Sequence, residues 1–481
     1  VFEPLMSAFF SPQAFHFQTQ LSDGQIVVVD YYNLNNNGFG TLYKFPAQPP
    51  AGQPPFGSWD PGLNPALKQG VFYNGLDNNR RMAFSPKGIS VVTPFTTGQD
   101  EAAPLTFYDQ AAGLNGEMSS NASIAFAAAA PDAALRSPAE SVPLDWPRLA
   151  GYLAAQGHVL DLEPAPRQFS GGFGNLNFLL RLDGNYCVLR RPPFGDVPIG
   201  ANDMAREHRV LSRLWQAWPL APRSLLYCAD ASVLGAHFLL MEYRPGLVIG
   251  GQLPPDVRAA AAGPALSSML VSVLASLHAV DAAAIGLGDF GKPAGFLART
   301  AASWTKRGEA AGTDRDRTLI AEISQWLAGR VPTELPATLL HSDFKLDNVV
   351  LDPATLEPRA VLDWDMSTRG DPLYDLATLL SYWVEPSDPE PMQRLQQMPT
   401  AHGGFASRAQ TLAAYAARTG RDLSHFTFYR VLCLFKLGVV FLQLHSRYRS
   451  GATLDARFGD LDGLGHGILG FTHAVMRGRA E

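Results

Sequence analysis

Two short segments decide the fold of this 481-residue chain: HSDFKLDN at residues 341–348 and VLDWD at residues 361–365. They present Asp343, Asn348 and Asp363 in a fixed order. Phosphoryl transfer needs a positioned acceptor hydroxyl, a divalent cation on the phosphate oxygens and positive charge near the developing anion. Magnesium prefers hard oxygen ligands and takes only one or two protein carboxylates. The two segments therefore predict a site of phosphoryl transfer.

Each residue of these segments has an expected role. We expect Asp343 to accept a hydrogen bond from the acceptor hydroxyl, and Asn348 and Asp363 to hold Mg²⁺. Lys345 lies two residues after Asp343 and is expected to reach the γ-phosphate of ATP, as the lysine at this place does in Ser/Thr kinases. His341 is interpreted as the structural anchor of the loop. A single Asp is more often a turn or capping residue, so the prediction depends on the ordered set.

A helix is predicted to follow, beginning within GDPLYDLA at residues 370–377. The combined pattern resembles the aminoglycoside phosphotransferase-like branch of the kinase-like superfamily, which reads H-G-D-F…N, then D-W, then G-D-P-x-x-D-L-A. Ser342 replaces the glycine of that pattern, a small-for-small change that we expect to be tolerated. The resemblance implies an α+β fold of the bilobal protein-kinase-like type, with a β-rich N-lobe and a helical C-lobe.

A glycine-rich turn between two strand signals lies upstream, in FSGGFGNLNFLLRL at residues 169–182. Glycines let the backbone approach phosphates closely and adopt positive φ. Taken alone, such a hairpin is more often only a turn. With the downstream segments in place, it is expected to cover the phosphates of ATP, and the residues expected to do so are Ser170, Gly171, Gly172, Gly174 and Asn175.

The next strand signal, YCVLRR at residues 186–191, ends with a basic pair. Arg190 falls where protein kinases carry the strand lysine of V-A-I-K, and an arginine there can still pair with phosphate. The helix predicted at residues 201–218 offers Glu207 as the partner that orients Arg190. The alternative interpretation of Glu207 is a solvated charge on the helix surface.

The segment AHFLLMEYRPG at residues 236–246 reads as a buried strand that runs into a breaker. A hinge between two lobes has this appearance, and Glu242 and Tyr243 are then expected to lend backbone groups to adenine. A plain core strand that ends in a turn reads the same way.

Two further stretches, VLASLHAVD at residues 273–281 and GLGDFGKP at residues 286–293, extend the resemblance. They are similar to the kinase domain associated with acyl-CoA dehydrogenase family members ten and eleven. That resemblance, which covers about residues 144–385, implies hydroxyacyl-CoA thioesters rather than aminoglycosides as substrates.

We call residues 361–365, which contain the expected metal ligand Asp363, the metal loop. After this loop the chain is expected to be helical at residues 373–383, 407–418 and 426–447. Asp375 is expected to hydrogen-bond back to the catalytic loop, or else to be an N-terminal helix carboxylate favoured by the macrodipole. The later helices, with residues 296–328, are expected to form the wall of the acceptor site. Arg299 and Trp304 there either meet the substrate or serve surface and core roles.

Composition is that of an ordinary soluble globular protein, with 46% hydrophobic and 17% charged residues. The net charge of −6 argues against general binding to nucleic acid or to anionic membranes. The three cysteines, Cys187, Cys228 and Cys433, have no metal-ligand spacing and suit a reducing compartment, so a cytoplasmic location is expected. The apolar stretches at residues 259–279 and 431–445 are interpreted as buried helices rather than membrane spans.

The first 117 residues fall outside the kinase pattern and are rich in Asn, Gly, Pro and aromatic residues. Turn-and-strand signals at residues 21–30 and 82–92 resemble single hairpins of β-propeller blades, so a propeller fragment is predicted. Residues 118–143 are expected to be a linker, 144–243 the N-lobe, and 244–481 the C-lobe with the catalytic and metal loops. We hypothesise that Met118 is the natural start of a separate kinase-like chain.

These features predict an ATP- and Mg²⁺-dependent phosphotransferase acting on the hydroxyl of a small molecule, with a hydroxyacyl-CoA as the implied acceptor. No nucleic-acid or membrane partner is expected, and no oligomeric state is predicted. One alternative is a nucleotide-binding pseudokinase or scaffold, which Arg190 at the strand position favours. The other is a fragment of a propeller-type binding protein fused to a kinase-like domain.

Overall fold

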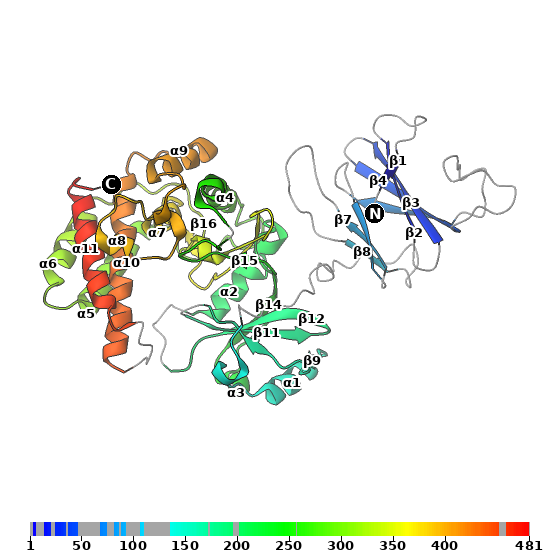
Figure 1. Ribbon diagram of the computed structural model, residues 1–481, viewed down its shortest axis with the longest axis horizontal. Helices are drawn as coiled ribbons and strands as arrows, with labels where there is room; N and C mark the ends of the chain where they lie inside the picture. The colour runs from blue at the N-terminus through cyan, green and yellow to red at the C-terminus, as the bar shows by residue number, and fades with distance from the viewer. Residues whose placement is uncertain are drawn as a thin grey trace. The chain divides into compact units, whose positions relative to one another are not determined.

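The computed structural model describes residues 135–171, 174–195, 202–255, 257–451 and 458–480, together with the strands within residues 3–109. The chain divides into two compact units, Val1–Ala127 and Ala128–Glu481, which Figure 1 shows and which are described one at a time below.

The first unit contains two antiparallel sheets in which strands adjacent in sequence pair with each other. The larger sheet consists of β1 (Glu3–Leu5), β2 (Ala14–Gln20), β3 (Gln25–Leu34), β4 (Asn37–Pro46) and β5 (Lys68–Asn74). The smaller sheet consists of β6 (Arg81–Ser85), β7 (Gly88–Val92) and β8 (Thr106–Asp109). The predicted turn-and-strand signals coincide with the start of β3 and with the β6–β7 hairpin. The propeller fragment stays a prediction.

The N-lobe of the second unit is an antiparallel sheet in the order β10 (Arg167–Gln168), β11 (Leu176–Leu182), β12 (Asn185–Arg191), β14 (Phe238–Glu242) and β13 (Ser224–Cys228), with β9 (Leu160–Asp161) paired to β11. Successive strand residues face opposite sides. One face carries Phe178 and Leu180, which pack with residues of α1 (Trp146–Ala154) and α3 (Ala231–Leu234). Asp145 caps α1 by accepting a hydrogen bond of 3.0 Å from the backbone of Arg148, as the sequence indicates.

The opposite face of the sheet, which includes Asn177 and Arg190, is covered in part by α2 (Met204–Leu211). The helix predicted at residues 201–218 is shorter than expected. After Leu211 the chain leaves the α-helix and makes a separate 3-10 turn at Leu214–Gln216. Residue 201 lies outside the described part of the chain.

A short segment before α1 belongs to the edge of this lobe. Leu135 forms a β-bridge with Phe169, and the backbone of Arg136 donates a hydrogen bond of 2.8 Å to the carbonyl of Gln168. The side chain of Gln168 in turn accepts a hydrogen bond of 2.8 Å from the backbone of Val142. Part of the stretch expected to be a linker is therefore attached to the strand that leads into the glycine-rich turn.

The lobes are joined after Glu242, where β14 ends. A few residues later, β15 (Leu247–Val248) pairs with β17 (Val349–Leu351) in a small sheet of the second lobe, together with β18 (Pro358–Val361). Gly246 lies in the link between β14 and β15, and a Cβ at this position would come within 2.4 Å of the carbonyl oxygen of Leu351. Only a residue without a side chain fits this position, so the link between the lobes has a defined path.

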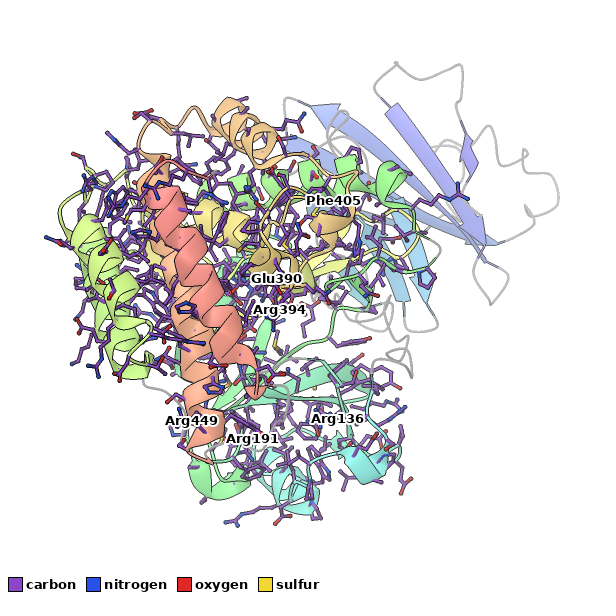
Figure 2. The ribbon with its side chains drawn as sticks, turned by 60° about the vertical axis from the view of Figure 1, so that its left-hand side comes forward. Arg136, Arg191, Glu390, Arg394, Phe405 and Arg449 are labelled. Atoms are coloured by element: carbon purple, nitrogen blue, oxygen red, sulfur yellow. The ribbon has the colours of Figure 1, made fainter. Side chains whose placement is uncertain are left out.

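The C-lobe is built of helices around a large apolar core. Its principal helices are α4 (Ala259–His278), α5 (Phe296–Ala311), α6 (Arg317–Ala328), α7 (Leu373–Tyr382), α9 (Arg408–Thr419), α10 (Phe426–Arg449) and α11 (Leu461–Met476). The expected helices at residues 373–383, 407–418 and 426–447 are present, and residues 296–328 form two helices. In Figure 2, Glu390, Arg394 and Phe405 belong to this lobe, whereas Arg136 and Arg191 belong to the N-lobe.

Helices α4 and α10 are long and apolar enough to cross a membrane by length and composition alone. Half of the apolar stretch of α4, and most of that of α10, is buried within the unit. Helix α10 packs against α7 and α11, and a Cβ on Gly465 of α11 would come within 3.0 Å of the carbonyl oxygen of Gly438 in α10. Their apolar side chains thus form the core of the C-lobe.

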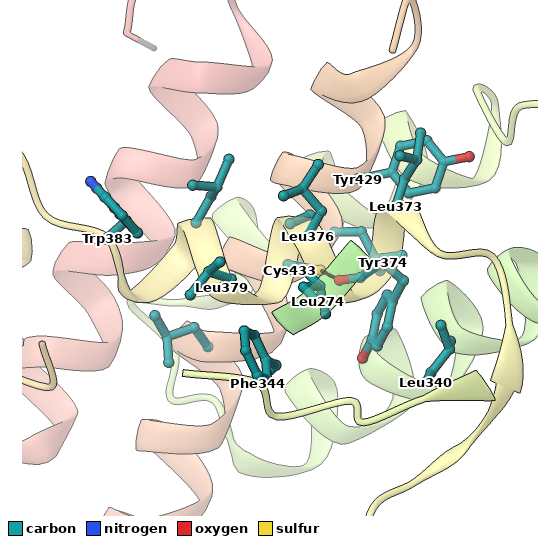
Figure 3. Close-up of a cluster of buried hydrophobic side chains, with 14 of the residues drawn as sticks. Leu274, Leu340, Phe344, Leu373, Tyr374, Leu376, Leu379, Trp383, Tyr429 and Cys433 are labelled. Atoms are coloured by element: carbon teal, nitrogen blue, oxygen red, sulfur yellow. Dashed lines mark hydrogen bonds between the residues drawn. The ribbon is translucent and has the colours of Figure 1, made fainter. Parts of the chain in front are cut away.

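The core also holds the catalytic segment in place. Phe344 is fully buried and, in Figure 3, lies beneath α7 beside Leu379. Tyr374 of α7 and Cys433 of α10 belong to the same apolar cluster as Phe344, so both helices contribute to the core at this segment. The apolar residues of this segment and of α7 thus fix where its polar residues emerge.

Candidate active site

The catalytic loop runs from β16 (Thr338–Leu340) to the 3-10 turn Leu346–Asn348. His341 is buried, and its Nε2 lies 2.8 Å from the carbonyl oxygen of Leu362 in the second segment. The carboxylate of Asp375 accepts hydrogen bonds of 2.7 Å from the backbone nitrogens of His341 and Ser342. The expected hydrogen bond from α7 to the loop is thus present, and His341 anchors the loop as interpreted.

Ser342 adopts a left-handed backbone conformation with φ of 69°. A glycine adopts this conformation without steric cost, whereas other residues do so at some cost. The hydroxyl of Ser342 is also buried without a hydrogen-bond partner among the described residues. The serine is therefore accommodated, but it is held in a conformation that the family's usual glycine would adopt more easily.

Asp343 is held from both sides of its carboxylate. Lys345 places Nζ 2.8 Å from Oδ2, and the hydroxyl of Tyr382 donates to Oδ1 at 3.0 Å. Burial by itself would raise the pKa of Asp343, but the positive charges of Lys345 and Lys436 outweigh it and lower that pKa below its ordinary value. Asp343 is therefore ionised at neutral pH, as an acceptor of a hydroxyl proton must be.

Asn348 lies beside Asp343. Its Nδ2 donates to the backbone oxygen of Asp343 at 2.9 Å and lies 3.4 Å from Oδ2 of the same residue. Because the amide nitrogen is committed to Asp343, the amide oxygen is the atom with which Asn348 would bind a cation. The backbone oxygen of Asn348 also accepts a 2.8 Å hydrogen bond from Leu362, so the two sequence segments lie side by side.

Asp363 is the residue after Leu362. Its carboxylate forms an ion pair with Arg190, which belongs to the N-lobe sheet. Arg190 donates through Nε to Oε2 of Glu207 at 2.7 Å, which is the pair expected from the sequence. Asp365 lies 3.7 Å from the same guanidinium group. Burial alone would lower the pKa of Arg190, but Asp363, Glu207 and Asp365 together raise it. The ion pair between Arg190 and Asp363 was not anticipated, because no local pattern links residues so far apart in sequence.

The glycine-rich turn lies over the same group of carboxylates. Asn175 donates through Nδ2 to Oδ2 of Asp365 at 3.1 Å and accepts a 2.9 Å hydrogen bond from Asn202. Ser170, Gly171 and Gly174 are described, whereas Gly172 lies outside the described residues. The side chain of Asn175 thus joins the turn to the metal loop, a contact that the sequence did not indicate.

The hinge residues have partners of their own. The backbone nitrogen of Glu242 donates a 2.8 Å hydrogen bond to the carbonyl of Arg223, so that group is already used within the lobe. The ring of Tyr243 lies 6.3 Å from that of Phe169 and 6.4 Å from that of Tyr186. The N–H of Glu242 is therefore not free to contact adenine, and an adenine contact through the other backbone groups of Glu242 and Tyr243 stays a prediction.

Three polar residues at the site were missed or left without a role. Burial and the charge of Asp363 raise the pKa of Asp365 well above its ordinary value. Tyr382, at the end of α7, and Lys436, within α10, approach the catalytic loop from distant parts of the sequence. The sequence showed Asp365 only as the last residue of D-W-D and Lys436 only as an interruption of an apolar run.

The acceptor-side residues considered from the sequence take structural positions. Trp304 is buried in the core, and Arg299 donates to the backbone carbonyls of Ala294 and Lys292. Trp304 therefore has a core role and Arg299 a surface role, rather than a contact with the substrate. Among the described residues, no group of three or more His, Cys, Asp or Glu side chains could hold a metal ion alone. The predicted site has one carboxylate and one amide, and it leaves the remaining positions to phosphate and water.

A two-lobed fold whose catalytic aspartate, asparagine and D-W-D loop meet an arginine of the N-lobe sheet defines a kinase-like phosphotransferase. Residues 166–410 match the model of the phosphotransferase enzyme family, and the chain belongs to that family. Membership of this family makes phosphoryl transfer the activity expected of this part of the chain. The bilobal fold and the family resemblance predicted from the sequence are confirmed.

Two curated relatives match more than half of the chain. Acyl-CoA dehydrogenase family member 10 of Mus musculus is 30% identical over 291 residues, which are 60% of this chain and 27% of that protein. Acyl-CoA dehydrogenase family member 11 of Rattus norvegicus is 32% identical over 287 residues, covering 59% of this chain and 36% of that protein. The chain thus spans about a third of the length of these curated relatives.

A solved structure shares the fold. The crystal structure of a candidate aminoglycoside phosphotransferase from Ralstonia eutropha JMP134 is 26% identical and superposes with a TM-score of 0.57. The match covers 70% of this chain and 99% of the Ralstonia eutropha chain. The likeness extends over both lobes of the second unit.

Proposed function

We propose that this protein transfers the γ-phosphoryl group of ATP, with Mg²⁺, to the hydroxyl of a hydroxyacyl-CoA. The observation that carries the proposal is the convergence of Asp343, Asn348 and Asp363, which come from two adjacent loops, opposite Arg190 of the N-lobe. A proton acceptor, two oxygen donors for a cation and a guanidinium group are what in-line phosphoryl transfer requires.

The donor set fits a divalent cation bound with a nucleotide. Glu207, Asp363 and Asp365 lie around the single guanidinium of Arg190. Burial raises the pKa of both Glu207 and Asp365, which leaves Asp363 as the carboxylate that a cation would use. Asn348 and Asp363 would hold Mg²⁺, which would neutralise charge on the phosphate oxygens when bound.

The protein's own groups would then share the remaining tasks. The ionised Asp343 accepts a hydrogen bond from the acceptor hydroxyl and orients its oxygen for attack. Lys345, now 2.8 Å from Asp343, is close enough to the reacting group to bind the γ-phosphate. Arg190, held by Glu207, binds phosphate oxygens from the sheet side.

The acceptor class is supported by the relatives. The relatives reported above are acyl-CoA dehydrogenase family members, and their names point to acyl-CoA thioesters. A phosphotransferase joined to such an enzyme would act on an acyl-CoA that carries a hydroxyl. The three free and buried cysteines are compatible with a reducing compartment, and a cytoplasmic location is part of the proposal.

The test is ADP release with Mg·ATP and a panel of hydroxyacyl-CoA thioesters that differ in hydroxyl position. The matched controls are the same acyl-CoA thioesters without the hydroxyl and an aminoglycoside panel. Acceptor-dependent ADP release with a hydroxyacyl-CoA alone supports the proposal. Release with an aminoglycoside alone would keep the enzyme and reject the acceptor.

A second candidate is a nucleotide-binding protein that does not transfer phosphate. The ion pair between Arg190 and Asp363 favours it, because that pair occupies a carboxylate that the cation requires. Thermal stabilisation by Mg·ATP without ADP release for any acceptor would favour this candidate over the enzyme.

A further inference from the structure

Lys436 is a buried cation in the middle of the apolar helix α10. Its side chain is 5% exposed, and its Nζ donates a hydrogen bond of 2.6 Å to the carbonyl oxygen of Ser342. The ammonium also lies 5.3 Å from the centre of the Tyr374 ring. Within the part of the chain that the structure describes, no carboxylate oxygen lies within ion-pairing distance of this ammonium.

Such a position costs folding free energy. A charge that is removed from water loses its hydration, and one carbonyl and one ring face replace it only in part. A methionine has nearly the same shape and would fill the space without this cost. The fold alone therefore gives no reason for a lysine at this position.

The reason lies in the residue that Lys436 touches. Ser342 is the residue with φ of 69° that directly precedes Asp343. Its backbone nitrogen is bound by Asp375 at 2.7 Å and its carbonyl oxygen by Lys436 at 2.6 Å, so both ends of the residue are fixed. A backbone in a sparsely populated conformation persists when its surroundings determine it from several sides.

We propose that Lys436 is a positioning residue for phosphoryl transfer, whose buried ammonium fixes the carbonyl of Ser342 and thereby the place of Asp343. The inference rests on the proposed function of Asp343 as acceptor of the hydroxyl proton. It assigns to a core helix a part in arranging the catalytic loop, which neither motif in the sequence contains.

The test compares Lys436→Met with Arg430→Met. Arg430 lies on the same helix, is 6% exposed and donates to the backbone oxygen of Leu380 at 3.2 Å, so it is a buried cation away from the catalytic loop. We expect Lys436→Met to unfold at the same or a higher temperature, and its kcat to fall roughly 10-fold or more with an unchanged KM for ATP. Arg430→Met is expected to keep kcat.

The split between kcat and KM gives a readout that a general loss of structure would not produce. Loss of the contact with Ser342 changes how Asp343 is positioned, so kcat is expected to fall while the KM for ATP stays unchanged. Arg430→Met is expected to keep both values.

Two outcomes would overturn the proposal. One is a Lys436→Met protein with kcat within about twofold of wild type. The other is a crystal structure of that variant with Ser342 and Asp343 in their original positions. If the wild type releases no ADP with any acceptor, the proposed function fails, and the crystal structure of the variant still decides whether Lys436 positions the loop.

Discussion

The hydroxyl of Tyr382 donates a 3.0 Å hydrogen bond to Oδ1 of Asp343, from the last turn of α7. Lys345 occupies the other oxygen of the same carboxylate, and its ammonium lies 5.5 Å from the centre of the Tyr382 ring. Burial is the main reason that the pKa of Tyr382 is raised well above its ordinary value, so its hydroxyl remains a donor at neutral pH. The two donors fix the plane of the carboxylate before an acceptor binds.

Replacing Tyr382 by Phe is expected to lower kcat roughly 10-fold with little change in the KM for ATP, because a hydrogen bond to a charged group is lost. The loss also disfavours the ionised form of Asp343, so the acid limb of kcat is expected to move to higher pH. Steady-state kinetics across pH measure both effects. Tyr429→Phe is the matched control, since it removes a 2.8 Å hydrogen bond from a hydroxyl to Asp371 at the other end of α7. Equal kinetics in the two variants would contradict a special role for Tyr382.

Asp343→Asn tests the proton acceptor itself. The amide retains the shape of the carboxylate but cannot accept the hydroxyl proton, so turnover is expected to fall about 10²-fold or more. Binding of Mg·ATP, followed by thermal shift, is expected to persist because Asn348 and Asp363 are intact. Undiminished turnover would remove Asp343 from the mechanism.

Asp363→Ala is expected to abolish binding of Mg·ATP. It deletes a cation ligand and leaves the buried Arg190 with fewer partners. The measurement is the rise in melting temperature on adding Mg·ATP, which should vanish in this variant. Asp352→Ala, which removes a loop carboxylate paired with Arg359, should retain that rise. A rise equal to that of wild type in Asp363→Ala would refute the assignment.

Ser342→Gly is expected to stabilise the protein by about 1 kcal/mol, because glycine adopts the left-handed conformation without steric cost. The change also removes a buried hydroxyl that lacks a partner in the described part of the chain. Urea unfolding at neutral pH measures the free energy of unfolding. A lower midpoint for the glycine variant would show that the serine hydroxyl makes a contribution that these contacts do not explain.

The parts of the site that the sequence predicted are those encoded by local patterns. The order of Asp343, Asn348 and Asp363, and the pairing of Arg190 with Glu207, follow from short motifs and from strand and helix periodicity. Helix α9 is also encoded locally, because Ser407 and Gln410 form a capping box at its start.

The contacts that were missed join distant segments. Lys436 reaches a residue 94 positions away, and Tyr382 reaches one 39 positions away. Neither has a neighbour in sequence that marks it as part of the site, because the packing of α7 and α10 alone brings them there. The helix predicted at residues 201–218 failed for a similar reason, since periodicity does not mark the change to a 3-10 turn after Leu211.

The bridge between Leu135 and Phe169 bears on where the smallest stable fragment of the second unit begins. A fragment cut at residue 144 would lose the backbone neighbour of Gln168 and leave the border of the N-lobe sheet open next to the glycine-rich turn. Open sheet borders invite pairing between molecules. A fragment that retains Leu135 would keep that border closed, and with it the support of the phosphate-covering turn.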